Sequence, residues 1–304
     1  MSKKIHVIDL KKIGYQEAYT IQKNIFKACD HNETSDTILF QENPPTITIG
    51  RGGSLNHLLI SEQQLKNRGI DLVHVDRGGD ITFHGPGQCV ISLILHLKEY
   101  TNNIHDYLRK LEEAVMLLLS DYKITAHRIE GYSGVWVGSH KIASVGIAIE
   151  HGITRHGIAI NVDPDLSFYD VIIACGIKDV QVTSIKKLTG KNIDIDHVKQ
   201  GFLRAFKHMF DVEYINEMQR KEPFMKTEVK IPNFAEGGTK IKLRQWLVEV
   251  GQVVKAGDNV AEAATDKISV FIEAPASGKV VSLLAEENDT VFIGDVIAEI
   301  SDEE

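Results

Sequence analysis

The sequence is poor in cysteine and proline and has no long apolar run. Its 304 residues include only 3 Cys and 7 Pro, and Cys29, Cys89 and Cys175 lack a CxxC spacing, which argues against a disulfide framework and a cysteine zinc site. The best apolar stretch, residues 90–97, is much shorter than the about 18 residues that a membrane span requires. The first residues are charged and lack the apolar centre of a signal peptide. We therefore expect a cytoplasmic protein with no membrane-spanning segment.

Patterns for metal and nucleic-acid binding are also missing. The 13 His residues form no HExxH or HxxxH pair, so we expect no metal site. No run of lysine and arginine interleaved with aromatic residues stands out, so we expect no nucleic-acid partner. With 43% hydrophobic and 25% charged residues, the composition is that of a folded globular protein.

Charge is distributed unevenly along the chain. The formal net charge is −8, and residues 227–304, with 15 acidic and 7 basic side chains, carry all of it. A polar stretch of about twelve residues, 216–227, connects the two parts and reaches on the order of 40 Å when extended. A step in composition of this kind marks a domain boundary. We predict a first domain at 1–216, a linker at 217–226 and a second domain at 227–304.

The second part contains an internal repeat. Residues 246–262 match residues 283–299 at a constant offset of 37. Each copy alternates β-branched runs with a Gly-Asp turn, a pattern typical of strands. The repeat predicts a flattened all-β barrel with quasi-twofold symmetry. The halves meet at residues 264–268, where we expect a tight hairpin turn that exposes Lys267 at its tip.

This part resembles the lipoyl and biotinyl carrier domains over residues 227–303. The matching marks are Thr-Asp-Lys at 265–267, the glycines of the first half and Ala-Pro-Ala-Ser-Gly at 274–278. Biotin carriers usually have Met on both sides of the lysine, whereas Asp266 precedes Lys267 here, so the resemblance favours lipoyl. It implies that Lys267 is the attachment site of a covalent octanoyl or lipoyl group. The alternative, an ordinary exposed turn lysine, stays open on the residues alone.

The larger part mixes helix and strand patterns without a regular βαβ alternation. It is therefore expected to be an α+β domain around a mixed sheet. The predicted helices span residues 14–30, 61–68, 104–121 and 195–210. The predicted strands span residues 4–10, 37–50 with a break at Pro44-Pro45, 71–76, 80–83, 88–97, 124–129, 134–138, 141–149 and 157–162.

Two features of this part point to chemistry. The stretch RGGDITFHGPGQ, residues 77–88, is rich in glycine, which permits close approach of the backbone to a ligand, while Arg77 and His84 add polar groups. No Gly-Lys-Ser/Thr follows, so it is not a phosphate loop; a purely structural turn fits it equally well. Lys141 begins one apolar strand, and Cys175 ends another apolar run. Taken singly, such a cysteine is usually a buried small hydrophobe and such a lysine an edge residue.

Together these stretches resemble the octanoyltransferases of lipoate biosynthesis over residues 1 to about 216. The further matching motifs are HKIASVGI (140–147), HGIAINVDPDLSFYD (156–170), ACGI (174–177) and VTSI (182–185). The resemblance implies the mixed sheet with helices found in biotin protein ligase and lipoate ligase catalytic domains. It also implies Cys175 as the nucleophile and Lys141 as its partner.

The resemblance assigns substrate binding to three of the motifs. The implied residues are Arg77, Gly78, Gly79, Asp80, Ile81, Thr82, Phe83, His84, Ser144, Val145, Gly146, Gly157, Ile158 and Ala159. Two positions depart from the family pattern, Phe83 where Tyr is usual and Ala174 where Pro is usual. The first is expected to remove a hydroxyl from the pocket, and the second to loosen the turn that carries the nucleophile.

The chemistry fits these residue types. An acyl group on an acyl carrier protein is a thioester, which a thiolate attacks without ATP, metal or other catalytic cofactor. A free thiol has a pKa of about 8.5, so a nearby ammonium is needed to stabilise the thiolate at neutral pH. Lys141 is the candidate for that charge and for proton transfer. The alternatives are an ATP-dependent lipoate-protein ligase and a non-catalytic acyl-carrying subunit.

The resemblance also implies the partners. They are octanoyl-acyl carrier protein as donor, lipoyl domains of 2-oxoacid dehydrogenase and glycine-cleavage proteins as acceptors, and lipoyl synthase as the downstream enzyme. The second domain of this same chain is a further acceptor. Acylation of Lys267 within one chain and between chains both stay open.

Overall fold

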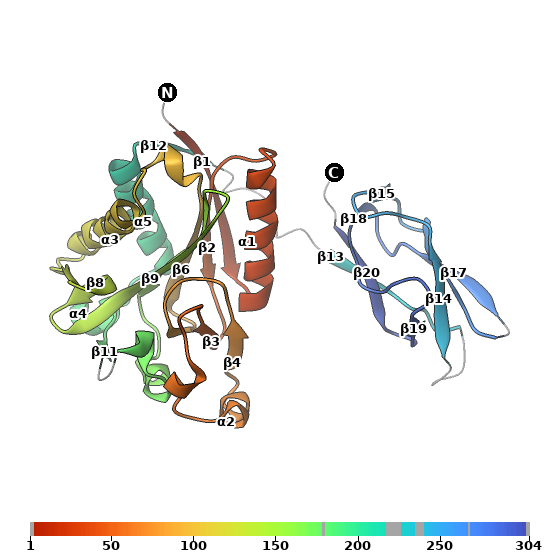
Figure 1. Ribbon diagram of the computed structural model, residues 1–304, viewed down its shortest axis with the longest axis horizontal. Coiled ribbons are helices and arrows are strands. Elements are labelled where there is room, and N and C mark those ends of the chain that lie inside the picture. The colour runs from red at the N-terminus through yellow and green to blue at the C-terminus, as the bar shows by residue number, and fades with distance from the viewer. Residues whose placement is uncertain (1–2, 178–179, 217–225, 235–239, 267, 302–304) are drawn as a thin grey trace. The chain divides into compact units, whose positions relative to one another are not determined.

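The computed structural model describes residues 3–177, 180–216, 226–234, 240–266 and 268–301 (Figure 1). The chain divides into two compact units, Met1–Gln219 and Arg220–Glu304, and each unit has a hydrophobic core of its own. Lys267 and almost all of the linker predicted at 217–226 lie outside the described residues. The linker boundaries and the role of Lys267 therefore stay predictions.

The first unit contains the predicted helices and strands with small shifts at their ends. Its helices are α1 (Tyr15–Asp30), α2 (Glu62–Asn67), α3 (Ile104–Asp121), α4 (Ile185–Thr189) and α5 (Ile195–Phe210). Its strands are β1 (Lys3–Lys12), β2 (Thr37–Glu42), β3 (Thr46–Ile49), β4 (Asp71–His74), β5 (Ile81–His84), β6 (Gln88–Ile94), β7 (His127–Ile129), β8 (Tyr132–Val137), β9 (His140–Glu150), β10 (Ile153–Asn161), β11 (Gln181–Val182) and β12 (Val212–Asn216). The sequence did not indicate α4, β11 or β12; α4 and β11 are too short to show a period.

Most strands of the first unit form one mixed sheet. Among the described residues it has nine strands in the order β12-β1-β2-β6-β10-β9-β8-β7, with β11 added beside β9. β1 pairs in parallel with both β2 and β12, whereas β2, β6, β10, β9 and β8 pair antiparallel in succession. This is the predicted α+β arrangement around a mixed sheet.

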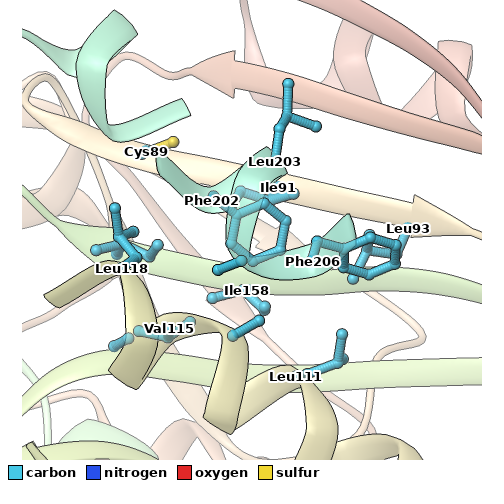
Figure 2. Close-up of a cluster of buried hydrophobic side chains, with 14 of the residues drawn as sticks. Cys89, Ile91, Leu93, Leu111, Val115, Leu118, Ile158, Phe202, Leu203 and Phe206 are labelled. Carbon is cyan, nitrogen blue, oxygen red and sulfur yellow. The ribbon is translucent and has the colours of Figure 1, made fainter. Parts of the chain in front are cut away.

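Helices cover both faces of this sheet (Figure 1). On one face α3 and α5 pack against alternating residues of β6 and β10, and Figure 2 shows the resulting apolar cluster, which includes Ile91, Val115, Ile158 and Phe202. α1 packs on another part of the sheet through a separate cluster that includes Ala18 and the strand residues Leu39, Ile94 and Ile153. Because side chains alternate along a strand, the residues of β6, β9 and β10 that do not point towards α3 and α5 lie on the opposite face of the sheet.

The Pro44-Pro45 break divides the strand predicted at 37–50. β2 stays in the main sheet, while β3 forms a small sheet in the order β4-β3-β5. β5 is the strand within the glycine-rich stretch 77–88, and it pairs antiparallel with β3 from Thr46 opposite His84 to Ile49 opposite Ile81. The small sheet thus carries the glycine-rich stretch.

The second unit is all-β, as predicted. Its strands are β13 (Lys226–Lys230), β14 (Ile241–Trp246), β15 (Val253–Val254), β16 (Asn259–Ala264), β17 (Ser269–Glu273), β18 (Gly278–Leu283), β19 (Thr290–Val291) and β20 (Val296–Ser301). They form two four-stranded antiparallel sheets, β13-β20-β18-β15 and β17-β16-β14-β19, whose apolar residues share one core.

The sequence repeat appears in this unit as a repeated turn. Gly257 and Gly294 have left-handed φ values of 89° and 90°, which favour glycine. The Asp258 carboxylate accepts a hydrogen bond from the Lys255 N–H, and the Asp295 carboxylate accepts one from the Phe292 N–H, both at 2.8 Å. The Gly-Asp pairs 37 residues apart therefore build the same turn twice, as the predicted quasi-twofold symmetry requires.

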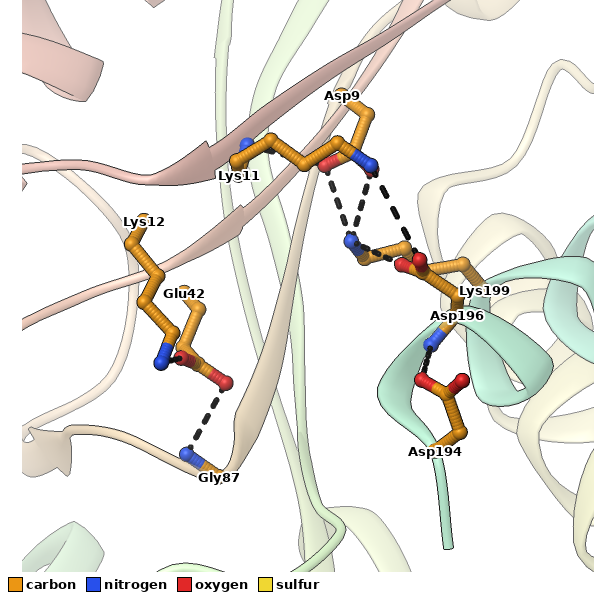
Figure 3. A network of polar contacts seen from close by, with 8 residues as sticks. All are labelled: Asp9, Lys11, Lys12, Glu42, Gly87, Asp194, Asp196 and Lys199. Carbon is orange, nitrogen blue, oxygen red and sulfur yellow. Dashed lines mark hydrogen bonds and ion pairs between the residues drawn. The ribbon is translucent and has the colours of Figure 1, made fainter.

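A buried ion-pair network connects β1 to α5 in the first unit (Figure 3). The Lys199 Nζ contacts Asp9 Oδ2 and Asp196 Oδ1, both at 2.8 Å. Burial by itself would raise the pKa of Asp9, but hydrogen bonds from Lys11 and Lys199 outweigh it and hold the pKa below its ordinary value. Burial would likewise lower the pKa of Lys199, but its carboxylate partners outweigh it and raise that pKa.

Lys199→Met is expected to lower the free energy of unfolding by about 3 kcal/mol at neutral pH, because it leaves the Asp9 carboxylate buried with only Lys11 beside it. The contribution of Asp9 is present above its ordinary pKa of 3.8 and is lost as the pH falls through its lowered pKa in the folded protein. Urea unfolding of variant and wild type at pH 7 and in acid measures this, and the difference should shrink in acid.

Lys12→Met is the matched control in the same region (Figure 3). The Lys12 side chain is 85% exposed and lies 3.2 Å from Glu42, an arrangement worth about 0–1 kcal/mol. An equal loss of stability in the two variants would contradict a special role for the Asp9–Lys199 pair.

Candidate active site

A cavity of about 200 Å³ lies in the first unit, lined by residues of α1, β5, β6, β9 and β10. Its floor is formed by the sheet residues that do not pack against α3 and α5. Those of β9 and β10 include the small residues Ser144, Gly146, Gly157 and Ala159. Gly146 lies directly opposite Gly157, and Ser144 opposite Ala159, so this line across the two strands carries only small side chains.

The loop at 77–80 forms another wall of the cavity. Arg77 is buried, and its guanidinium donates hydrogen bonds to the Thr48 carbonyl and hydroxyl, both at 2.8 Å, and to the Gly78 carbonyl at 3.1 Å. Burial lowers the pKa of Arg77. A Cβ at Gly146 would lie 3.0 Å from the Gly78 carbonyl oxygen, so the bare floor also lets this loop approach the sheet.

His84 is held at the cavity wall as a neutral ring. Its Nδ1 lies 2.8 Å from Gln88 Oε1 and its Nε2 lies 3.3 Å from the Thr48 hydroxyl, while its ring stacks on Tyr15 at 5.2 Å between centroids. Burial, aided by the Arg77 charge, lowers the pKa of His84 to about 3. His84 is therefore a fixed hydrogen-bonding group rather than a cation at neutral pH.

Phe83 does not line the cavity. Its side chain points to the other face of β5, where its ring stacks on Phe168 at 4.7 Å and meets the edge of Tyr169. Because neighbours in a strand face opposite sides, Thr82 and His84 face the ligand space and Phe83 does not. The expectation that Phe83 binds substrate, and that its missing hydroxyl changes the pocket, is wrong.

Lys141 and Cys175 meet in the cavity although 34 positions separate them. The Lys141 Nζ donates to the Cys175 Sγ at 3.1 Å. Lys141 is only 4% exposed, and its side chain lies along a gap that Gly134 leaves in β8, where a Cβ would lie 2.5 Å from the Lys141 Cε. Its ammonium also lies 5.3 Å from the centre of the Trp136 ring. The Lys141 side chain is thus buried with its Nζ against the thiol, and Lys141 is not the edge residue that is usual at the start of a strand.

A constrained turn presents Cys175 to the cavity. Cys175 has φ 58° and ψ 17° within a 3-10 turn at Ala174–Gly176, a left-handed conformation that is rare for residues other than glycine. Gly176 is also left-handed, and a Cβ there would overlap the Asp80 carboxylate. The Ile173 N–H donates to the His57 carbonyl at 2.8 Å. The turn therefore rests on the glycine-rich loop and on the segment around His57.

The structure brings the predicted site residues together, with Phe83 excepted. Cys175, Lys141 and the other thirteen residues predicted for substrate binding line the same cavity. The sequence did not single out further lining residues, namely Tyr15, Tyr19, Gln22, Gln41, Val90, Ile91, Ser92, Gly131, Tyr132, Ser133, His156 and Ile177. The lining residues on α1 lie on the same helical face as its core residues, so the sequence pattern does not distinguish them from ordinary core packing. His156 could have been predicted, because it is the first residue of the motif at 156–170.

A polar cluster lies beside the cavity around Asp76. The Asp76 carboxylate accepts from the Tyr19 hydroxyl and from His156 Nε2, both at 2.7 Å, and contacts Arg155 Nη2 at 2.7 Å. The hydrogen bond from His156 in particular holds the pKa of Asp76 well below its ordinary value. Burial and the neighbouring Asp76 raise the pKa of Tyr19 to about 12. These contacts fix the orientation of the Tyr19 and His156 rings.

In the second unit, the predicted hairpin lies between β16 and β17. The Thr265 N–H donates to the Ile268 carbonyl at 2.8 Å, and the Ile268 N–H donates to the Thr265 hydroxyl at 3.1 Å. The turn predicted at 264–268 is thus confirmed, although Lys267 itself is outside the described residues.

The described residues were also searched for metal-binding groups and for membrane-spanning helices. Within them no group of three or more His, Cys, Asp or Glu side chains is arranged to hold a metal ion. Each helix in this part of the chain is too short or too polar to cross a lipid bilayer.

Family models match both units. The lipoyl protein ligase A/B catalytic domain matches residues 14–207, and the biotin-requiring enzyme domain matches residues 227–300. Among solved structures, lipoate-protein ligase A bound with ATP has a TM-score of 0.56 at 17% identity, covering 71% of this chain and 90% of that one. A bi-partite lipoate protein ligase from Thermoplasma acidophilum has the same score and identity, with 71% and 88% coverage. At this identity the likeness shows the fold alone.

Curated relatives that are more similar in sequence than these solved structures are named octanoyltransferases. The octanoyltransferase of Desulforamulus reducens is 37% identical over 211 residues, covering 69% of this chain and 92% of the relative. That of Flavobacterium johnsoniae is 38% identical and covers 71% and 100%, and that of a Thermoanaerobacter species is 41% identical and covers 70% and 92%. The ligase and non-catalytic alternatives are therefore not favoured. The chain belongs to the octanoyltransferase family and carries a biotin/lipoyl-type domain after its catalytic domain.

Proposed function

We propose that the chain transfers an octanoyl group from octanoyl-acyl carrier protein to the lysine of lipoyl domains, through a thioester on Cys175. The observation that carries this proposal is the 3.1 Å contact between the Lys141 ammonium and the Cys175 sulfur inside the cavity of an octanoyltransferase-family fold. An ammonium hydrogen-bonded to sulfur stabilises the thiolate, which is the nucleophilic form of cysteine.

In the first half-reaction, the Cys175 thiolate attacks the carbonyl carbon of the octanoyl thioester. The new carbon–sulfur bond replaces the bond to the carrier's thiol, which leaves as a thiolate and takes a proton from the Lys141 ammonium. One thioester is exchanged for another, so the step is close to balanced in free energy and needs no ATP. Lys141 is left as a neutral amine beside the acyl group.

In the second half-reaction, the amine of an acceptor lysine attacks the Cys175 thioester. An amide bond forms and the Cys175 sulfur leaves as a thiolate. The attacking nitrogen loses a proton, which neutral Lys141 accepts, and the ammonium–thiolate pair is restored. An amide is more stable than a thioester, which drives transfer forward. Lys141 thus acts as acid in one half-reaction and as base in the other.

The walls of the cavity suit the two parts of the donor. Ser144, Gly146, Gly157 and Ala159 form a small-residue floor on which an alkyl chain can lie. Arg77 donates its hydrogen bonds to neutral oxygens, so its positive charge stays available to the polar thioester end of the donor. As part of the proposal, the small residues of the floor bind the alkyl chain and Arg77 binds the thioester end.

We further propose that Lys267 of the second unit is an acceptor and carries the covalent octanoyl or lipoyl group. The supporting observations are the biotin/lipoyl match at 227–300 and the hairpin turn between β16 and β17. Other acceptors of this chemistry are lipoyl domains of 2-oxoacid dehydrogenase and glycine-cleavage proteins, and lipoyl synthase is the enzyme that would act next on the octanoyl group.

The test incubates the full-length chain with octanoyl-acyl carrier protein and a separate lipoyl domain, without ATP. We expect an octanoyl adduct on the chain that hydroxylamine removes, and an octanoyl amide on the acceptor that it does not. Intact-protein mass spectrometry distinguishes the two. Transfer that occurs only with free lipoate and ATP would reject this proposal and establish a ligase.

Lys141→Ala is expected to slow transfer by about 100-fold or more at pH 7, the usual range for loss of an acid–base group. Part of the rate should return in alkali, because an isolated thiol ionises by itself at about pH 8.5. The pH dependence of octanoyl transfer for variant and wild type measures both effects. Superimposable profiles would show that Lys141 neither stabilises the thiolate nor moves the proton.

A further inference from the structure

The bare floor of the cavity continues from β9 across β10 to β6. Gly157 lies opposite Gly146 on one side and opposite Ser92 on the other. Neither glycine carries a side chain, and a Cβ at Gly146 would lie 3.0 Å from the Gly78 carbonyl oxygen and 3.4 Å from the Arg77 Cδ, so the 77–78 loop covers the β9 end of this line. We call the part of the cavity between this loop and the sheet the groove, and Ser92 of β6 lies at its other end.

Gln22 of α1 stands at the β6 end of this groove. It is only 3% exposed and lines the cavity. Its Nε2 donates to the Ser92 hydroxyl at 2.8 Å, and its Oε1 accepts from the His156 N–H at 3.0 Å. Both ends of the amide are thus tied to the sheet, one to β6 and one to β10.

Two rings support Gln22 on the same side of the cavity. Tyr19, one helical turn before Gln22, stacks on His156 at 5.3 Å between centroids, and both rings donate to Asp76. We call Gln22, Tyr19 and His156 the end wall. Because its polar atoms are hydrogen-bonded, moving Gln22 aside would leave buried groups without partners, which is costly.

The Lys141–Cys175 pair lies towards the opposite end of the groove. Gly134 of β8 leaves a gap filled by the Lys141 side chain, and a Cβ there would lie 3.3 Å from the Lys141 Nζ, which places the ammonium beside β8. From β8 to β6 are three strand spacings of about 4.8 Å each, a distance of roughly 14 Å across the sheet. A thioester sulfur, an extended octanoyl chain and the radius of its terminal methyl group together span most of this distance.

We propose that Gln22, held by Ser92 and His156, sets the length of the acyl chain that the enzyme accepts. The inference rests on the proposed function, since it presumes an acyl group on Cys175 with its tail along the groove. Octanoyl fills the groove up to the end wall. A longer chain must push its terminal carbons against a buried amide that cannot move without losing its hydrogen bonds.

The test compares carrier protein loaded with octanoyl or dodecanoyl groups, using the full-length chain and measuring initial rates of acylation at Cys175. Gln22→Ala removes the wall and should raise the ratio of dodecanoyl to octanoyl rates at least tenfold. Gln16→Ala is the matched control, because Gln16 is exposed on the same helix and should leave the ratio unchanged. An unchanged ratio in folded Gln22→Ala would overturn the proposal.

A second variant tests the same wall in the opposite direction. Ser92→Val adds volume at the end of the groove and should lower the octanoyl rate at least tenfold relative to the hexanoyl rate. If thermal unfolding shows that Gln22→Ala does not fold, Ser92→Val alone tests whether the end wall limits the length of the acyl chain. Equal hexanoyl and octanoyl losses would contradict the length limit. A wild type that takes no octanoyl at all would instead reject the proposed function itself.

Discussion

Cys175→Ser should abolish octanoyl transfer, with a loss of at least a thousandfold. A serine hydroxyl cannot be ionised by the Lys141 ammonium as a thiol can, and an oxygen ester is a weaker acyl donor than a thioester. Both the hydroxylamine-sensitive adduct on the chain and the amide on the acceptor should disappear. Mass spectrometry of the two proteins after incubation with octanoyl-acyl carrier protein measures each bond separately.

The other two cysteines provide matched controls. Cys29 and Cys89 are fully buried, and burial raises the pKa of each thiol to about 12, so neither is a thiolate at neutral pH. Cys29→Ala and Cys89→Ala should retain most of the transfer activity once their folding has been verified by thermal unfolding. Full activity in Cys175→Ser would reject covalent catalysis.

Lys267→Arg should eliminate the octanoyl amide on the second unit while the thioester on Cys175 still forms. The two bonds form in sequence, so removing the acceptor amine leaves the first step intact. Arginine keeps the charge, but its guanidine is so strongly basic that it stays protonated and offers no neutral nitrogen as a nucleophile. Hydroxylamine treatment followed by peptide mass spectrometry locates the remaining label. The expected effect is complete loss of the stable label on this unit.

Lys255→Arg is the matched control, because Lys255 is an exposed lysine of the same unit and should leave the amide in place. Persistence of the amide in Lys267→Arg would show that another lysine is the acceptor. The dependence of the half-time on protein concentration then distinguishes the route. Reaction within one tethered chain gives a half-time that dilution does not change, whereas reaction between chains slows on dilution.

Much of the fold could be predicted because its signals are local. The helices at α1, α3 and α5 show a clear apolar period, and Asn103 and Asp194 cap the last two with side-chain hydrogen bonds. The Gly-Asp turns of the second unit repeat in the sequence and in the structure. β12 could not be predicted, because its place beside β1 depends on a parallel pairing across some two hundred positions of chain.

The site shows the same division. The motifs included Cys175, Lys141 and most of the residues that line the cavity. The residue types alone could not show that the two reacting groups meet, because this depends on the parallel pairing of β11 with β9 and on the turn at Ala174–Gly176. The prediction that Phe83 lines the pocket did not hold, because a motif does not show on which face of a strand a side chain lies. Gln22 and Tyr19 were missed because their helical spacing is indistinguishable from that of core residues.

The left-handed backbone conformation at Cys175 lowers the stability of the fold, while the cysteine at this position is needed for activity. A residue with a Cβ in this conformation costs the fold roughly 1 kcal/mol or more, and glycine or asparagine would relieve that strain. Neither offers a nucleophile. Selection for stability alone would therefore drive this position away from cysteine, and the enzyme keeps a locally strained native state as a condition of its chemistry.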